Sequence, residues 1–249
     1  MTEVRRIIAG LGLALAVTHA AAVPGRAQSA AEVCLTANEA ISLGIPLPRT
    51  AGRLKAGGLR IVAVGSSSTT GLWVLSLDAT YPQVMRRELA ALRPAAQIEV
   101  INSGRIGDTV SGSIRRFQHD VLAYRPDLVI WQLGTNDVAW GGHADGLKQL
   151  IVDGVRTLKG EGADVILMDL QYAPMILYTS QHELMQATIA EVAREERVGL
   201  FSRFSLMRRS IEAGLPASAL VAWDGLHNSA AGYDCVGRAL ARAVHAAAR

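Results

Sequence analysis

The sequence has few cysteines, few aromatic residues and little excess of charge. Among its 249 residues are two cysteines and six histidines, and only 5% are Phe, Trp or Tyr. The histidines are scattered and neither cysteine has a near partner, so the spacing of a metal cluster is absent. We therefore expect chemistry that needs no metal and no cofactor.

The charge is close to balanced. Without residues 1–27, which carry three arginines and one glutamate, the formal net charge falls from +3 to +1. A nucleic-acid partner favours a basic stripe with interleaved aromatics. The arginines at positions 86, 87, 115 and 116 lie in helical patterns instead. We expect no nucleic-acid partner.

Long apolar runs are confined to the start of the chain. Arg5 and Arg6 precede the apolar stretch Ile7–Val17, and small residues follow at Ala20 and Ala27. This is the layout of a secretory signal peptide. No later segment reaches the roughly 18 to 20 apolar residues of a membrane span. We expect residues 1–27 to be a signal peptide, and the mature protein to be periplasmic or extracellular without a stable membrane span.

Export would place Cys34 and Cys235 where disulfides persist. A bond between them is one interpretation, and two separately buried thiols are the other. The sequence alone does not choose between them, because a disulfide requires a specific distance between the two backbones.

Apolar segments alternate with amphipathic ones along the mature chain. Four apolar runs rich in Val, Ile and Leu predict strands buried on both faces, at 59–64, 98–101, 128–133 and 165–170. A short fifth strand is expected at 200–201. Helical patterns separate them at 81–92, 110–124, 144–159 and 181–196, and a last helix follows Ser229 as N-cap. The alternation predicts an α/β protein, a three-layer α/β/α sandwich with a mainly parallel five-stranded sheet.

The absence of repeats and charge runs indicates one domain in the mature chain. We expect residues 28–58 to be an N-terminal extension and residues 59–249 to form the domain.

Three polar clusters stand out in the sequence, two of them directly after predicted strands. Gly65-Ser66-Ser67-Ser68 and Gly134-Thr135-Asn136-Asp137 each come after an apolar run, and Asp224-Gly225-Leu226-His227 precedes the last helix. A serine at a strand end can be an exposed nucleophile, an aspartate three residues before a histidine can orient it as a base, and an asparagine can donate to an oxyanion. Because sites of parallel sheets form at the carboxyl ends of the strands, these clusters predict a hydrolase.

These residues resemble the four blocks of the SGNH hydrolases, also called GDSL esterases/lipases. The blocks are Gly65-x-Ser67, Gly107 within 102–109, Gly134-x-Asn136-Asp137 and Asp224-x-x-His227, in the family's order. The resemblance runs from about Leu59 to the C-terminus and implies the flavodoxin-like SGNH hydrolase fold.

The resemblance also implies a role for each matching residue. Ser67 would be the nucleophile, His227 its general base and Asp224 the acid of a catalytic triad. The backbone N–H groups of Ser67 and Gly107, with the amide of Asn136, would form the oxyanion hole. Two positions depart from the family. Ser66 stands where an aspartate is usual, so hydrogen bonding in this loop must differ, and Asn228 stands where a proline often follows the histidine, although asparagine suits the helix entry equally well.

The substrate is less constrained than the reaction. Trp73, Trp140 and Tyr172 lie in loops after strands, where they would line a substrate pocket or be partly buried in the core. We expect a serine esterase that acts through an acyl-enzyme on a small or carbohydrate-linked ester.

Other functions stay open at this point. An acyl thioesterase or lysophospholipase of the same family is an alternative. So is a flavin-binding, flavodoxin-like protein, because residues 68–73 partly resemble a hydroxyl-rich phosphate loop. A catalytically inactive carbohydrate-binding relative is a further one.

Overall fold

The computed structural model describes residues 29–37 and 41–249, so the expected signal peptide lies outside the described residues. Its centre is a five-stranded sheet in the order β2-β1-β3-β4-β5, with every neighbouring pair parallel. The strands are β1 (Gly58–Gly65), β2 (Gln97–Gly104), β3 (Leu128–Gln132), β4 (Asp164–Met168) and β5 (Gly199–Phe201). β3 is buried along its whole length, which explains its continuous apolar sequence.

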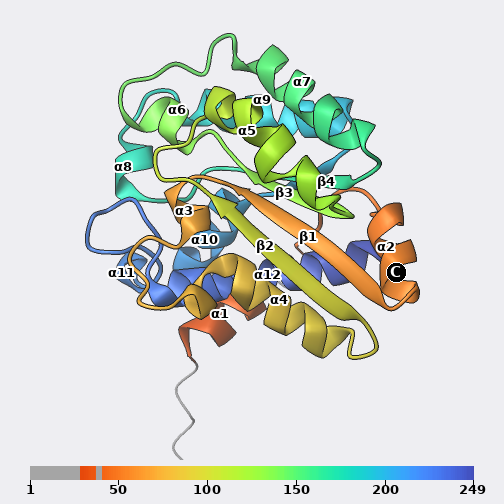
Figure 1. Ribbon diagram of the computed structural model, residues 1–249. Coiled ribbons are helices and arrows are strands. Elements are labelled where there is room, and N and C mark those ends of the chain that lie inside the picture. Colours follow the sequence, from red (N-terminus) through yellow and green to blue (C-terminus); the bar gives the residue numbers. More distant parts are fainter. Residues whose placement is uncertain (1–28, 38–40) are drawn as a thin grey trace, which may run out of the picture.

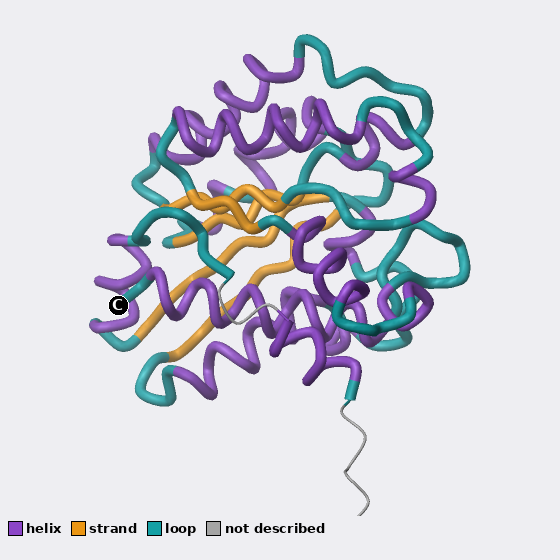
Figure 2. The backbone as a smooth tube through the Cα atoms, turned by 180° about the vertical axis from the view of Figure 1, so that it is seen from behind, coloured by secondary structure: helices purple, strands orange, loops and turns teal. Residues whose placement is uncertain are grey.

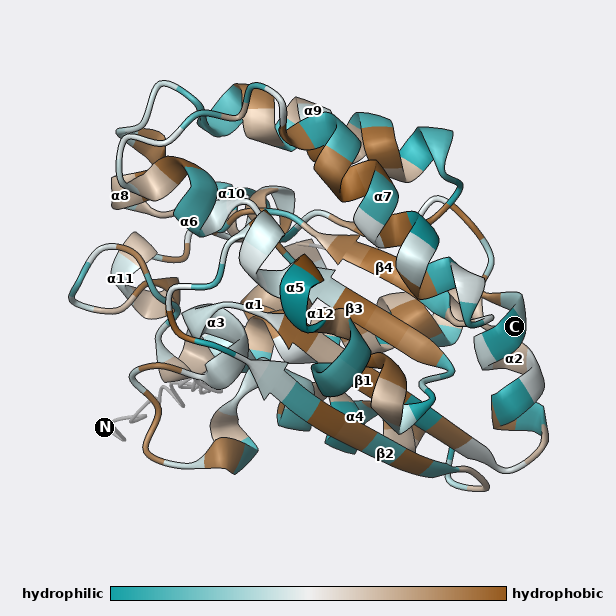
Figure 3. Cartoon of the chain, turned by 45° about the horizontal axis from the view of Figure 1, so that its top comes forward, coloured by the Kyte–Doolittle hydropathy of each residue, from teal (hydrophilic) through white to brown (hydrophobic). Residues whose placement is uncertain are grey.

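Helices cover both faces of the sheet, as Figure 1 and the reverse view in Figure 2 show. One layer contains α4 (Tyr81–Leu92), α12 (Ala230–Ala247), α1 (Ala30–Ala37) and α10 (Arg203–Glu212), and the other contains α5 (Val110–Asp120), α7 (Leu147–Gly160) and α9 (His182–Glu195). Apolar residues concentrate in the strands, between the two layers (Figure 3). This is the three-layer α/β/α sandwich that the sequence predicts.

Helices α4 and α12 approach each other closely because α12 has a glycine at the contact. A Cβ atom on Gly237 would lie 2.6 Å from Cβ of Val84 and 2.8 Å from the carbonyl oxygen of Tyr81.

The remaining helices are short: α2 (Pro48–Lys55), α3 (Ser67–Thr70), α6 (Thr135–Ala139), α8 (Pro174–Leu177), α11 (Ala217–Leu220) and two 3₁₀ turns, η1 (Leu77–Ala79) and η2 (Leu122–Tyr124).

The N-terminal segment before β1 packs onto the sandwich. Leu43 and Leu47 are buried, and the N–H of Leu47 donates to the carbonyl oxygen of Ala247 at 2.9 Å. A disulfide joins Cys34 on α1 to Cys235 on α12. The described part of this segment therefore shares the core of the domain that follows.

The strand order places a topological switch point at β1. The chain passes from β1 to β2 on one side and returns to β3 on the other, so the connections diverge at the carboxyl ends of these strands. Ligands of open parallel sheets bind at such switch points. The segments after β1, β2 and β3 carry Ser67, Gly107 and Asn136.

Candidate active site

Ser67 is the first residue of α3, directly after β1. Its Oγ lies 2.7 Å from Nε2 of His227. Both residues are buried, at 7% and 8% exposure. The contact joins residues 160 positions apart in the sequence, and it is the hydrogen bond through which a histidine can accept the proton of a serine nucleophile.

Asp224 holds the other nitrogen of the same imidazole. Nδ1 of His227 lies 2.5 Å from Oδ2 of Asp224, while Oδ1 accepts the backbone N–H groups of Leu226 and His227, each at 3.0 Å. Burial alone would raise the pKa of Asp224, but the hydrogen bond with His227, the two backbone N–H groups and Trp73 outweigh it and lower the pKa to about 2. The carboxylate is therefore ionised at neutral pH.

Trp73 supplies a further hydrogen bond to this carboxylate. Its indole Nε1–H donates to Oδ2 of Asp224 at 2.7 Å. The backbone of Trp73 has φ +72°, a left-handed conformation that is unfavourable for a large side chain. Its ring also packs edge to face on Trp223, with centroids 4.9 Å apart. These contacts hold Trp73 in its strained conformation beside the acid.

Asn136 lies in the first turn of α6, after β3. Its Nδ2 donates to the carbonyl oxygen of Asp108 at 2.8 Å, which leaves the second amide hydrogen for another acceptor. Gly107, the residue before Asp108, has φ +77°, which glycine adopts readily. The bond to Asp108 brings the Asn136 amide beside the Gly107 loop.

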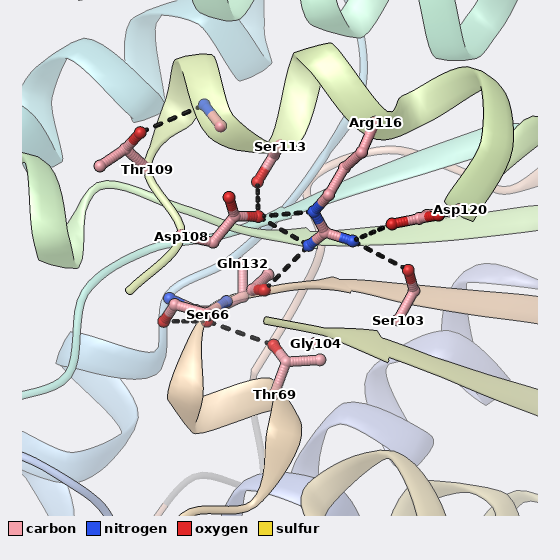
Figure 4. Close-up of polar contacts among 12 residues, drawn as sticks. Ser66, Thr69, Ser103, Gly104, Asp108, Thr109, Ser113, Arg116, Asp120 and Gln132 are labelled. Atoms are coloured by element: carbon pink, nitrogen blue, oxygen red, sulfur yellow. Dashed lines mark hydrogen bonds and ion pairs between the residues drawn. The ribbon is translucent and has the colours of Figure 1, made fainter. Parts of the chain in front are cut away.

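Arg116 connects this loop to the end of β1. Its guanidinium donates to Oδ2 of Asp108 at 2.6 and 2.9 Å, to Oγ of Ser103 at 3.0 Å and to the carbonyl oxygen of Gly65 at 3.1 Å (Figure 4). Arg116 and Asp108 both have buried side chains, at 8% and 5% exposure. One buried ion pair thus links the strand end before the nucleophile to the loop that Asn136 contacts.

Gln132 explains how the serine at position 66 is accommodated. Its Oε1 accepts the backbone N–H of Ser66 at 2.8 Å, the Ser66 hydroxyl at 2.9 Å and the Thr69 hydroxyl at 3.2 Å (Figure 4). A neutral amide oxygen from β3 therefore organises the nucleophile loop.

Gln171 contacts the loop that carries His227 through a hydrogen bond to Leu226. Its Nε2 donates to the carbonyl oxygen of Leu226 at 3.0 Å, and its Oε1 accepts from Thr135 at 2.9 Å and from Arg203 at 2.6 Å. Arg203 is fully buried, and burial lowers the pKa of its guanidinium. Gln171 thus connects the block after β3 to the segment that carries the catalytic pair.

A family model, the Non-GDSL lipase-like family, matches residues 33–249. The chain belongs to this family. It is similar to an acetylxylan esterase of Geobacillus stearothermophilus, with 28% identity over 63% of this chain and 76% of that protein. It is also 28% identical to an arylesterase of Vibrio mimicus, over 45% of this chain and 60% of that protein.

Solved structures share the fold of this member of the Non-GDSL lipase-like family. A lipase/acylhydrolase from Enterococcus faecalis superposes with a TM-score of 0.64, covering 76% of this chain and 96% of that one at 22% identity. A two-domain esterase active on acetylated mannans superposes with a TM-score of 0.68 at 22% identity. The alignment covers 79% of this chain and about half, 51%, of that protein. The fold is that of the SGNH/GDSL-type hydrolases, and the chain is a carboxylic ester hydrolase.

Of the three aromatic residues expected at a substrate pocket, Trp73 lies beside Asp224 in this family member. Trp73 lines a cavity of about 700 Å³ next to Asp224. Trp140 is 69% exposed and does not line that cavity, and Tyr172 packs edge to face on Phe204. Trp223, which stands in none of the sequence motifs, also lines the cavity, with its ring against that of Trp73.

Several supporting residues of this Non-GDSL lipase-like protein were missed by the sequence analysis. Gln132 and Gln171 carried a readable signal, since each is a polar residue near the end of an otherwise mostly apolar run. Arg116 carried none, because an arginine in an amphipathic helix usually faces solvent. Within the described residues, no helix is long and apolar enough to span a bilayer and no cluster of His, Cys, Asp or Glu fits a metal ion.

Proposed function

We propose that this protein is an exported serine esterase that forms an acyl-enzyme on Ser67. The observation that carries the proposal is the continuous relay from Ser67 Oγ to His227 Nε2 and from His227 Nδ1 to Asp224, at 2.7 and 2.5 Å. The family membership and the esterase relatives support the same chemistry.

The reaction follows from this relay. Ser67 Oγ attacks the ester carbonyl carbon while His227 Nε2 accepts its proton, and the oxyanion that forms is stabilised by the N–H groups of Ser67 and Gly107 and by the Asn136 amide. The tetrahedral intermediate then releases the alcohol, whose oxygen takes the proton from Nε2. Water, deprotonated by His227, cleaves the acyl-enzyme to the acid and frees Ser67.

Export is the second part of the proposal. It rests on the signal-peptide pattern of residues 1–27 and on the disulfide between Cys34 and Cys235, which fits an oxidising compartment. Expression of the full chain, followed by mass spectrometry of the protein from periplasm or medium, tests it. A mature N-terminus near residue 28 is expected. An uncleaved chain confined to the cytosol contradicts export.

The substrate we propose is a small or carbohydrate-linked ester. Two of the similar proteins carry names that specify acetylated polysaccharide or aryl esters. A third, Esterase TesA of Pseudomonas aeruginosa, is 25% identical over 67% of this chain and 78% of that protein. Rates on acetylated xylan, small acetate esters, a lysophospholipid and an acyl thioester separate the esterase from the thioesterase or lysophospholipase alternative.

The nucleophile is tested by replacing each serine of the loop. Ser67→Ala should abolish ester hydrolysis and labelling by a fluorophosphonate, because it removes the attacking oxygen. Ser66→Ala and Ser68→Ala are matched controls and should keep measurable activity. Labelling that persists in Ser67→Ala would place the nucleophile elsewhere.

A further inference from the structure

The cavity beside Asp224 has walls of one chemical kind. Its volume of about 700 Å³ lies in the range of small-molecule sites. Seven residues of its lining are apolar or aromatic: Trp73, Pro174, Ala217, Val221, Ala222, Trp223 and Ala230. Gly225, Ser218 and Ser229 complete the lining. The Ser229 hydroxyl is already engaged, because it donates to Ala219 and accepts from Gly232. The lining thus offers apolar contact and little hydrogen bonding.

This lining favours an apolar group over a sugar. A buried pyranose brings several hydroxyls, and each one that loses water without gaining a partner weakens binding. No carboxylate, amide or guanidinium lines the cavity to supply such partners. An alkyl or aryl group needs none, and each buried methylene strengthens its binding about fourfold.

The position of the cavity indicates which part of an ester reaches it. Trp223 and Gly225 flank Asp224 in the chain, and Trp73 is hydrogen-bonded to it, so the cavity adjoins the loop that carries Asp224 and His227. The oxyanion donors come from the loops after β2 and β3 instead. Because His227 must deliver its proton to the departing oxygen, the leaving alcohol faces the histidine side. Figure 1 shows α8 and α11, which contribute to the walls, at the same end of the sheet as α3.

We propose that this cavity binds the alkyl or aryl group of the leaving alcohol, so that the enzyme prefers esters of apolar alcohols. The inference rests on the proposed esterase mechanism and narrows its substrate class. In the step concerned, the bond between the acyl carbon and the alcohol oxygen breaks, Nε2 of His227 gives its proton to that oxygen, and the released alcohol occupies the cavity.

Alkyl acetates test the proposal without changing the acyl group. Methyl, butyl and hexyl acetate have leaving groups of similar acidity, so kcat/KM should rise about fourfold per added methylene until the cavity is filled. Methyl esters of longer acids serve as the comparison series, because their extra methylenes lie on the acyl side and should not depend on the cavity.

Charged variants of the wall identify the cavity. Ala217 and Ala230 are exposed first residues of α11 and α12, where an aspartate is compatible with the helix. Ala217→Asp and Ala230→Asp should each lower the ratio of kcat/KM for hexyl acetate to that for methyl acetate at least tenfold. Ala213→Asp is the matched control, since Ala213 is exposed, close to α11 and outside the lining. An unchanged ratio in both wall variants overturns the proposal.

A binding measurement separates this proposal from the esterase function. Titration of the intact protein with 1-hexanol should change tryptophan fluorescence saturably, because Trp73 and Trp223 line the cavity, and Ala217→Asp should abolish the change. If the protein binds 1-hexanol saturably but hydrolyses no ester, the cavity is a binding site for apolar alcohols and the proposed esterase mechanism is refuted. Ester hydrolysis without hexanol binding or alkyl preference refutes the cavity alone.

Discussion

We call the Asn136 side of the candidate active site the oxyanion side, after its proposed role, and the Asp224 side the acid side. The two sides are held in opposite ways. On the oxyanion side, Asn136 and the Asp108 loop depend on Arg116, whose charge is buried against a buried carboxylate. On the acid side, Asp224 is fixed by its own loop and by Trp73, which is 47% exposed. The first side has its support in the core, and the second has it at the surface beside an open cavity. Changes to the first should therefore affect folding together with catalysis, and changes to the second should affect catalysis alone.

The largest effect is expected for Asp224→Asn. The change removes the charge that orients the imidazole, and a comparable change in a serine-protease triad costs about four orders of magnitude in rate. Because the pKa of Asp224 is about 2, the wild-type carboxylate stays ionised from neutral pH down to about pH 3. Across that range the deficit in kcat/KM should not be relieved by pH. Near wild-type turnover in this variant, with His227→Ala inactive, would assign the acid role to another group.

Arg116→Met tests the buried support of the oxyanion side. It leaves the Asp108 carboxylate buried without its cation, and breaking one partner of a buried pair costs about 3 to 5 kcal/mol. The free energy of unfolding from urea titration should fall by about this amount, and kcat should fall with it. The control is Arg115→Met, at the neighbouring exposed position. Equal stability of the two variants would contradict the role given to the buried pair.

Asp169, at the end of β4 near Arg203, gives a pH test of the core. Burial raises its pKa to about 6, against the lowering by the Ser202 hydroxyl and the Phe204 N–H. The unfolded pKa of an aspartate is about 3.9, lower than this folded value. As the pH rises from the unfolded pKa to the folded pKa, ionisation favours the unfolded state, and the free energy of unfolding falls by about 3 kcal/mol in total. The stability of the wild type relative to Asp169→Asn should therefore decrease between pH 4 and pH 7. For the control, Asp145→Asn at an exposed position, the difference in free energy of unfolding from the wild type should not vary with pH. The same constancy in Asp169→Asn would contradict the raised pKa of Asp169.

The smallest effect is expected for Trp73→Phe. Phenylalanine keeps an aromatic ring but lacks the N–H that donates to Asp224, so kcat should fall about tenfold, the equivalent of one hydrogen bond to a charged group. The free energy of unfolding should change little, because Trp73 is half exposed and its backbone is strained. Trp140→Phe, an exposed tryptophan outside the cavity, is the control. A large loss of stability in Trp73→Phe would remove the contrast between the two sides.

The fold followed from the sequence wherever one local signal dominated. Helix α4 has the predicted bounds, Tyr81–Leu92, and Ser229 caps α12 through the N–H of Gly232 as expected. The predicted helix 144–159 begins later, at Leu147, because Gly146 with φ +79° precedes it in a left-handed turn. The predicted helix 110–124 ends at Asp120, and its last turn is the separate 3₁₀ helix η2. Within the described part of the chain, seven α-helices were not predicted: α1, α2, α3, α6, α8, α10 and α11. Four of them have only four or five residues, too few for a helical period to show in the sequence.

The residues of the proposed triad could be selected from their motifs, whereas the contacts of the residues that support them could not. Ser67, Asp224 and His227 stand in short patterns with a chemical meaning. The Trp73 bond to Asp224 spans 151 positions and the Gln132 bonds to Ser66 span 66, so no local pattern shows which groups these side chains contact. Long-range hydrogen bonds of this kind are set by the sheet order, which a single sequence does not specify.

The disulfide has a consequence for how this protein responds to proteases. Cys34 and Cys235 are 201 positions apart, and the covalent loop they close includes Ser67, Asp224 and His227. A single cut in an exposed loop such as residues 72–78 would therefore leave both fragments attached to each other, with the nucleophile on one and the base on the other. Such nicked protein should migrate as one band on a non-reducing gel and separate only after reduction.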